Sequence, residues 1–178
     1  MTPETITIDE SGMTFGPYPS EHCFHIEKSA LYTDIRQGVK MAEFLLLHAD
    51  SDRPAMLWVV EAKSSSPRPK NDPGFGQFIM EIREKWINAL SLVLASRLGR
   101  HRQAGTDLPG SFKTFDLSRF DVRFVLVING HRKSWLPPIQ AALQKSLRPL
   151  VRTWNFAPTS VIVLNDELSV KHHLLPRT

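Results

Sequence analysis

The sequence contains a single cysteine, Cys23, among 178 residues. One cysteine cannot form a disulfide within the chain, which excludes the small secreted folds held together by disulfides. Long hydrophobic runs are also missing: unbroken apolar stretches such as Phe44–Leu47 and Phe124–Ile128 are far shorter than the roughly 20 residues of a membrane helix. The segment Met1–Glu4 lacks the basic start and apolar centre of a signal peptide. We therefore expect a cytoplasmic protein that does not enter membranes.

Acidic and basic residues are unevenly divided along the chain. Residues 1–92 contain 9 Lys/Arg and 13 Asp/Glu, a net charge of −4, whereas residues 93–178 contain 13 and 5, a net charge of +8. This division suits a protein that gathers carboxylates around a cation and bases around a polyanion. Two solvated surfaces without a binding role would give the same counts, so the distribution alone does not choose.

With 42% hydrophobic residues, the chain is rich enough in apolar side chains to build one domain over residues 1–178. Alternating or continuous apolar runs predict strands at Thr5–Asp9, Met13–Phe15, Ala42–His48, Ala55–Lys63, Val122–Ile128 and Val161–Leu164. Apolar residues three to four positions apart predict helices at Ser20–Arg36, Gln77–Leu98 and Pro137–Leu150. We expect Pro149 to end or kink the last of these helices, and residues 100–119 to form a long irregular loop.

The order of these elements predicts an α/β fold. Turn-forming residues at 49–54 join two strands into an antiparallel hairpin, and the strand–helix–strand order at 122–164 predicts a parallel crossover. We expect a mixed central sheet, with an antiparallel hairpin and parallel strands, flanked by helices. Residues 1–19 would form an N-terminal hairpin, residues 20–130 a core of order αββαβ, and residues 131–178 an added helix, strand and tail.

The residues most informative about chemistry end the strand at 55–63. Four apolar residues precede Glu61, Ala62 and Lys63, so charged side chains stand at the end of a buried strand. Side chains two positions apart share one face of a strand, so Glu61 and Lys63 point the same way. A strand end that reaches solvent and carries an ordinary ion pair is the alternative.

The hairpin supplies a second carboxylate. If its turn is centred on Asp52, Glu43 lies directly opposite Glu61, with β-carbons about 5 Å apart. Two carboxylates at that separation repel each other unless a cation lies between them. Oxygen ligands suit Mg²⁺ or Mn²⁺. Asp50 and Asp52 are rival ligands, but turn formation at the far end of the hairpin explains both.

Over roughly residues 20–130 the sequence resembles the PD-(D/E)xK nuclease superfamily. The resemblance consists of a first helix that carries a glutamate, an acidic residue at the start of one strand, and Glu61-Ala62-Lys63 at the end of the next strand. The resemblance implies a restriction-endonuclease-like fold in which Glu43, Glu61 and the Ala62 carbonyl bind Mg²⁺ or Mn²⁺. It implies that Lys63 orients water or steadies the transition state. Glu27 resembles an additional helical glutamate, and Gln77 a glutamine of exonuclease-type members. The chain departs from the pattern in having Ala42 before the first acid and glutamate in place of aspartate there.

The activity implied is metal-dependent hydrolysis of DNA phosphodiester bonds, with RNA as an alternative substrate. A partner protein, a second copy of the chain, or the ends and structure of the nucleic acid would supply specificity, and the protein would be the cutting part of a larger system. Basic residues would hold the nucleic acid backbone without reading its sequence, and the candidates are Arg97, Arg100, Arg102, Arg132, Lys133, Lys145, Arg148 and Arg152.

Two other functions stay open. One is a nuclease-like domain that no longer cuts and serves as a binding or assembly subunit; the other is a structural protein whose acid–lysine pair is coincidental. His22, Cys23 and His25 do not predict a zinc site, because a fourth ligand and closed spacing are missing. We expect Cys23 and the Trp86/Phe78 stripe to belong to the core.

Overall fold

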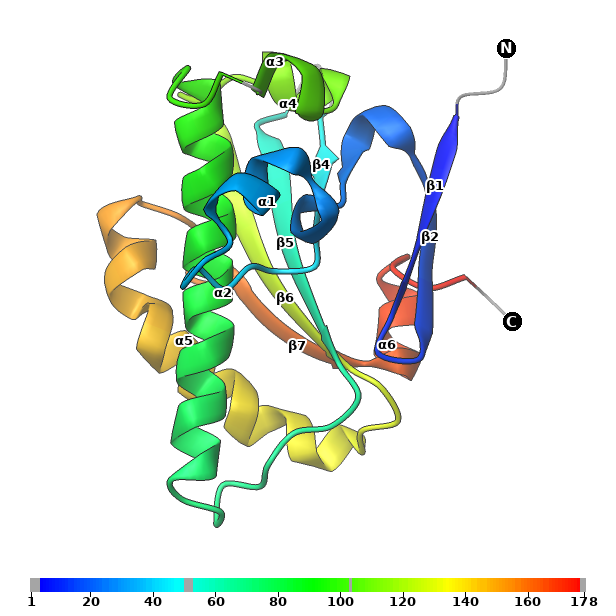
Figure 1. Ribbon diagram of the computed structural model, residues 1–178. Helices are drawn as coiled ribbons and strands as arrows, with labels where there is room; N and C mark the ends of the chain where they lie inside the picture. The colour runs from blue at the N-terminus through cyan, green and yellow to red at the C-terminus, as the bar shows by residue number, and fades with distance from the viewer. Residues whose placement is uncertain (1–3, 50–52, 103, 177–178) are drawn as a thin grey trace.

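The computed structural model describes residues 4–49, 53–102 and 104–176, and its centre is a five-stranded sheet (Figure 1). The strand order is β3–β4–β5–β6–β7. From one edge of the sheet to the other, the strands are β3 (Cys23–Phe24), β4 (Phe44–His48), β5 (Ala55–Lys63), β6 (Phe120–Ile128) and β7 (Val161–Asn165). The β3–β4 and β4–β5 pairs are antiparallel, and β5–β6 and β6–β7 are parallel. The mixed α/β sheet that the sequence predicts is therefore confirmed.

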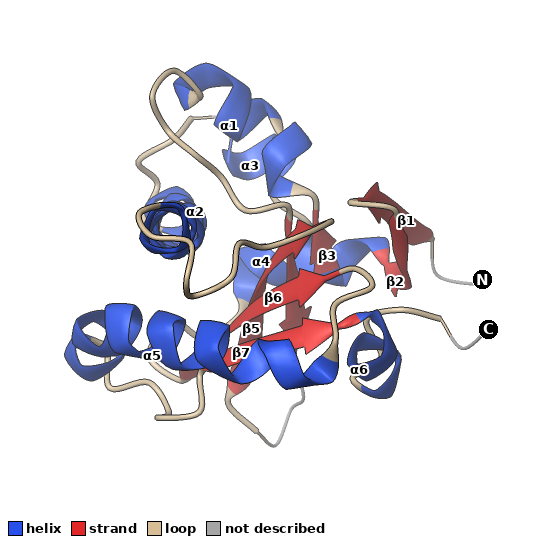
Figure 2. Cartoon of the chain, turned by 90° about the horizontal axis from the view of Figure 1, so that it is seen from below, coloured by secondary structure: helices blue, strands red, loops and turns tan. Residues whose placement is uncertain are grey.

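Helices cover one face of the sheet and a two-stranded hairpin covers the other (Figures 1 and 2). On the first face lie α1 (Ala30–Ile35), α2 (Gly74–Arg97) and α5 (Leu136–Thr153). On the second lie the antiparallel pair β1 (Thr5–Glu10) and β2 (Met13–Pro19), with α6 (Asp166–Lys171) beside them. No helix in the described ranges has both the length and the apolarity to cross a bilayer.

Alternation along β5 sends its side chains into two separate cores. Leu57 and Val59 pack against α2, whereas Trp58 and Val60 pack against the β1–β2 hairpin. Glu61 continues the first series, so the strand geometry aims its carboxylate at α2. The long helix is buried at three- to four-residue intervals, as its sequence predicts, through Ile79, Ile82, Trp86, Ala89, Leu90 and Val93.

The predicted helix at Ser20–Arg36 is wrong. The structure has 3₁₀ turns at Ser20–His22 and Ile26–Lys28, the short strand β3 between them, and an α-helix only over Ala30–Ile35. Cys23 pairs with Leu46 and Phe24 with Leu45, so edge pairing with β4 outweighs local helix propensity. Ser29, not Ser20, caps the helix by accepting a hydrogen bond from the Tyr32 N–H at 3.1 Å.

The stretch 100–119 is not the irregular loop predicted. It contains α3 (Ala104–Asp107) and α4 (Gly110–Thr114), which bury Leu108, Phe112 and Phe115. The polar residues between these apolar positions obscure their helical spacing in the sequence. Pro149 does not end its helix early either, because the burial of Leu143 and Leu147 holds α5 together to Thr153. Asp52, the expected centre of the β4–β5 turn, lies outside the described residues.

Candidate metal centre

The end of β5 and the start of β4 bring two glutamates together. Phe44 pairs with Val60 and Leu47 with Leu57, so one further step along the ladder sets Glu43 opposite Glu61. The Glu43 N–H donates to the Val60 carbonyl at 3.1 Å, which continues the pairing beyond the strand. This is the register that the sequence predicts.

Both carboxylates are deeply buried. Glu61 is 0% exposed and Glu43 is 6% exposed. Within the described part of the chain, the Oε2 atom of each has no hydrogen-bond partner. A buried ionised carboxylate is costly unless hydrogen bonds or a cation compensate it. Each of these groups therefore keeps one oxygen available to a cation.

A lysine that sequence reasoning missed lies between the two acids. Lys85 of α2 places its Nζ 2.7 Å from Glu61 Oε1 and 3.9 Å from Glu43 Oε1. The expected lysine, Lys63, has its Nζ 3.2 Å from Glu61 Oε1 and 3.2 Å from Oε1 of Glu81, one turn before Lys85. In the sequence, Glu81 and Lys85 look like an ordinary ion pair on an exposed helix face. Their role becomes visible only when the rotation of α2 against β5 is known.

Burial and neighbouring charges shift the pKa values of the cluster. Burial raises the pKa of Glu43 to about 9, helped by a hydrogen bond shared with Glu27 and by the negative charges of Glu61 and Glu27, and opposed by Lys85. Burial also raises the pKa of Glu61, against the opposing effect of Lys85 and Lys63. Burial alone would lower the pKa of Lys85, but the Glu61 carboxylate outweighs it and raises that pKa. In the absence of a cation, Glu43 is therefore protonated at neutral pH.

The third predicted acid joins the same cluster from an unpredicted element. Glu27 lies in the 3₁₀ turn Ile26–Lys28 rather than on a long helix. Its N–H donates to the Glu43 carbonyl at 3.4 Å, and the two carboxyl groups share a hydrogen bond. The fold thus brings together Glu27, Glu43 and Glu61, which come from three separate segments.

The remaining predicted site residues lie beside this cluster. Ala62 sits between Glu61 and Lys63 in β5, with its side chain buried on the hairpin face. Gln77 is exposed on α2, one turn before Glu81, the partner of Lys63. With Glu81 it lines a shallow surface hollow.

The donor set fits a hard divalent cation. Glu43 and Glu61 each have a buried oxygen without a partner among the described residues, and Glu27 lies next to Glu43. Oxygen donors of this kind suit Mg²⁺ or Mn²⁺. The Lys85 ammonium already supplies a positive charge at the same carboxylates, so a cation would compete with it for Glu61.

Some of the expected nucleic-acid contacts lie at the same edge of the sheet. The Asn129 N–H, just after β6, donates to the Lys63 carbonyl at 2.9 Å, and Arg132 and Lys133 follow shortly after it. The Arg132 guanidinium lies 5.1 Å from the centre of the Trp135 ring. Arg68, which the sequence did not single out, lies 3.9 Å from the same ring.

The other expected contacts lie elsewhere. Arg97 is twelve residues beyond Lys85 on α2, about 18 Å along the helix axis, and Arg100 and Arg102 lie further on. The Arg97 guanidinium donates to the carbonyls of Phe112 at 2.8 Å and Phe115 at 3.1 Å. The last three basic candidates lie on α5, which packs beside α2 (Figure 1), and these are Lys145, Arg148 and Arg152.

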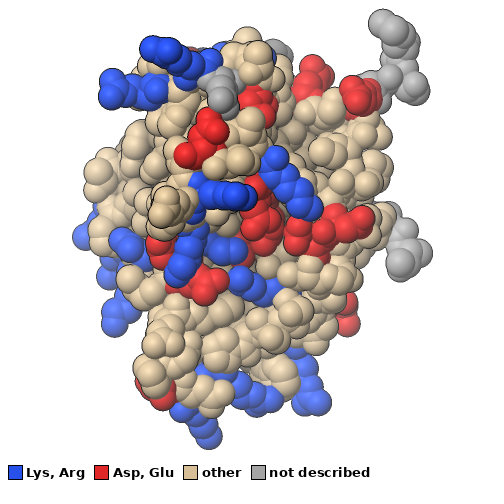
Figure 3. All heavy atoms as spheres, viewed as in Figure 1, with Lys and Arg blue, Asp and Glu red and all other residues tan. Residues whose placement is uncertain are grey.

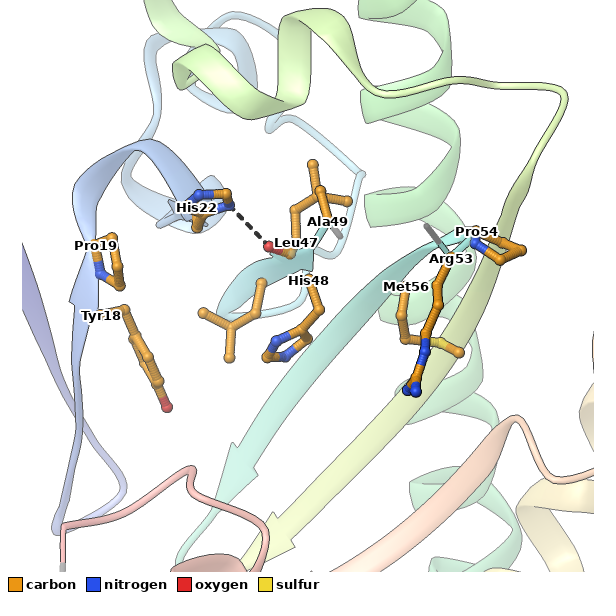
Figure 4. Close-up of a pocket in the computed structure, with 10 residues that line it drawn as sticks. Tyr18, Pro19, His22, Leu47, His48, Ala49, Arg53, Pro54 and Met56 are labelled. Carbon is orange, nitrogen blue, oxygen red and sulfur yellow. Dashed lines mark hydrogen bonds between the residues drawn. The ribbon is translucent and has the colours of Figure 1, made fainter. Parts of the chain in front are cut away.

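Acidic and basic side chains are interspersed across the middle of the face that carries α1 and α2 (Figure 3). A separate hollow beside β2 and β4 has a different character (Figure 4). Tyr18, His22, His48 and Met56 line it, and His22 Nδ1 lies 3.1 Å from the Leu47 carbonyl oxygen. None of the described residues that line this hollow is acidic, so it does not rival the carboxylate cluster as a cation site.

Among known proteins, only solved structures show a similarity to this chain. No family model matches the sequence, and no curated protein matches it. Among solved structures, restriction endonuclease FokI is similar to 79% of this chain, with 17% identity and a TM-score of 0.38. The match covers 22% of the FokI chain, so this chain corresponds to about a fifth of that protein.

Proposed function

We propose that this protein is a divalent-metal-dependent nuclease that hydrolyses phosphodiester bonds of DNA. Glu43, Glu61 and Glu27 would hold Mg²⁺ or Mn²⁺. The observation that supports this most strongly is the pair of buried carboxylates, each with an unpartnered oxygen, beside Lys63 at one edge of the sheet. Packing alone gives no reason to place such charges at the end of an apolar strand.

Lys63 is held in a position suited to a phosphate. Its ammonium is fixed by carboxylate oxygens of Glu61 and Glu81, each at 3.2 Å, while the side chain stays 25% exposed. A bound cation would polarise the phosphate and lower the pKa of an attacking water. Lys63 would neutralise the negative charge that grows on the phosphate oxygens in the transition state. Glu81 would keep the Lys63 ammonium at that position.

Basic side chains at the same edge would hold the substrate backbone. Arg132 and Lys133 follow β6 beside Lys63, and Arg68 packs on Trp135 next to them. Contacts of this type bind phosphates without reading base sequence, so binding would weaken steeply with salt.

The direct test is incubation of the purified protein with linear and circular duplex DNA, single-stranded DNA and RNA, in EDTA, Mg²⁺ or Mn²⁺. Cleavage that requires the cation and is lost in Glu61→Gln supports the proposal. Glu167→Gln, at an exposed position on α6, serves as the matched control and should cleave normally. Absence of cleavage of every substrate with either cation contradicts the proposal.

One observation favours a second candidate, a nuclease-like domain that binds nucleic acid or a partner without cutting. The Lys85 ammonium lies 2.7 Å from Glu61 and already neutralises the carboxylate that a cation would need. In that case the cluster is a completed structural ion pair. Salt-sensitive DNA binding with no cleavage, and no Mn²⁺ binding at Glu43 and Glu61, would favour this candidate.

A further inference from the structure

A second group of metal-ligating side chains lies next to the proposed centre. Glu10 ends β1, and His25 and Glu27 stand on either side of Ile26 before α1. One ligand atom from each of these three residues lies within 4.8 Å of the others. The proposed nuclease mechanism uses Glu27 but neither Glu10 nor His25.

The His25 imidazole is the unusual member of this group. Its side chain is only 17% exposed, and its Nε2 lies 4.0 Å from Glu10 Oε1. That nitrogen is buried and has no hydrogen-bond partner in the described part of the chain. A buried imidazole nitrogen that faces carboxylates without a hydrogen bond is a good ligand for a metal ion.

Glu27 connects this group to the first centre. Its carboxyl group shares a hydrogen bond with Glu43, whose side chain is 8% exposed and whose Oε2 has no partner. One carboxylate of Glu27 could therefore contact two neighbouring cations. Lys28 pairs with Glu10 at 3.5 Å, but its side chain is 64% exposed and can move into water at little cost.

The donor atoms indicate which cation would bind. Mg²⁺ prefers oxygen ligands, whereas a mixed set of imidazole and carboxylates suits first-row transition metals. We propose that Glu10, His25 and Glu27 bind a second divalent cation of that class, represented by Mn²⁺, beside the Glu43–Glu61 centre. This inference deepens the proposed function, because the two centres share Glu27.

The test is a Mn²⁺ titration of the full chain by calorimetry and electron paramagnetic resonance. The wild type should bind two Mn²⁺ ions. His25→Ala should bind one, and Glu10→Gln should weaken one site by at least the roughly 10- to 100-fold that loss of an outer-shell partner costs. The nitrogen coupling of a bound imidazole should be present in the wild type and absent from His25→Ala. His172→Ala, which removes an exposed histidine from the end of α6, is the control and should keep both sites.

The two proposals fail differently. Glu61→Gln should lose the first site and keep the nitrogen-coupled one. If His25→Ala and Glu10→Gln both bind as many Mn²⁺ ions as the wild type, with unchanged affinity and spectra, the second site does not exist, whatever the cleavage assay gives. If the nitrogen-coupled site is present but no substrate is cleaved, the second site stands and the proposed nuclease function is wrong. Melting temperatures measured in EDTA identify any variant that fails to fold.

Discussion

Two of the partly buried cationic side chains on α2, Lys85 and Arg97, have different surroundings. Near the C-terminus of the helix, the Arg97 guanidinium donates to two backbone carbonyls, of Phe112 and Phe115, and lies 5.0 Å from the centre of the Phe115 ring. Near its middle, the Lys85 ammonium contacts two carboxylates that each keep an unpartnered oxygen. The first arrangement is complete, and the second leaves acceptor capacity unused.

The difference distinguishes a cationic side chain that only joins two elements, Arg97, from one that lies in the candidate metal centre, Lys85. Arg97 joins α2 to α4 with neutral carbonyl acceptors, and no further ligand is needed there. The cluster around Lys85 gathers buried carboxyl groups that packing does not require. The unpartnered buried oxygens are the groups that the proposed cation would satisfy.

Of the substitutions that test this difference between Lys85 and Arg97, Lys85→Met should have the largest effect on stability. Removing the ammonium leaves Glu61 buried without its nearest partner, so the free energy of unfolding in EDTA should fall by about 3–5 kcal/mol. Mn²⁺ should then restore stability by more in Lys85→Met than in the wild type, because the competing cation has gone. Thermal melts in EDTA and in Mn²⁺ measure both effects. A variant whose melting temperature responds to Mn²⁺ as the wild type does would show that Lys85 and the metal do not share a site.

Lys63→Met should reduce cleavage roughly 10²- to 10³-fold, the loss expected when one preorganised group that stabilises the transition state is removed. Mn²⁺ binding should persist, since the acids remain. Single-turnover cleavage rates and a Mn²⁺ titration separate the two properties. Lys171→Met, on the exposed side of α6, is the control. Wild-type cleavage by Lys63→Met would remove this lysine from the mechanism.

Arg97→Met should cost about 1–3 kcal/mol of stability, because it leaves two carbonyls of the α4 segment without their donor. It should change neither Mn²⁺ binding nor the rate of cleavage. Chemical denaturation measures the first effect, with the exposed Arg100→Met as control. Reduced DNA binding by folded Arg97→Met would instead support its predicted contact with nucleic acid.

Glu43→Gln should flatten the pH dependence of stability in EDTA. The pKa of Glu43 is raised from 4.5 to about 9, so the folded state holds a proton that the unfolded state releases. This contribution to stability is present below about pH 4.5 and is lost as the pH rises through about 9. Between about pH 6 and about pH 9, the melting temperature of the wild type should therefore fall more than the melting temperature of Glu43→Gln. Equal slopes would contradict the assignment.

The protonation of Glu43 makes the affinity for metal depend on pH in the opposite direction to stability. A cation must displace the proton on Glu43, so the affinity for Mn²⁺ should rise with pH up to about 9 in the wild type. The dependence should be weaker in Glu43→Gln. Calorimetric titrations in buffers of different ionisation enthalpy would count the protons released.

The hairpin part of the site was predictable because two simple rules fix it. Alternation sets the common direction of Glu61 and Lys63, and the pairing register sets Glu43 opposite Glu61. Both rules depend only on residue spacing along β4 and β5. The parallel pairing of β5, β6 and β7 follows from the order of elements in the same way.

The contributions of Lys85 and His25 were not predictable in the same way. The position of Lys85 depends on how α2 rotates against the sheet, which the packing of Trp86 and its neighbours decides. His25 faces Glu10 because residues 20–28 form turns and an edge strand instead of a helix. In both cases, contacts between distant segments override the local pattern.

The most direct test of the central claim is a crystal structure of the protein soaked in Mn²⁺, with diffraction data collected at a wavelength where manganese scatters anomalously. If the proposed cation site exists, an anomalous peak should be bonded to oxygens of Glu43 and Glu61, with the Lys85 ammonium displaced from Glu61. An intact Lys85–Glu61 contact, with no manganese at either carboxylate, would contradict it.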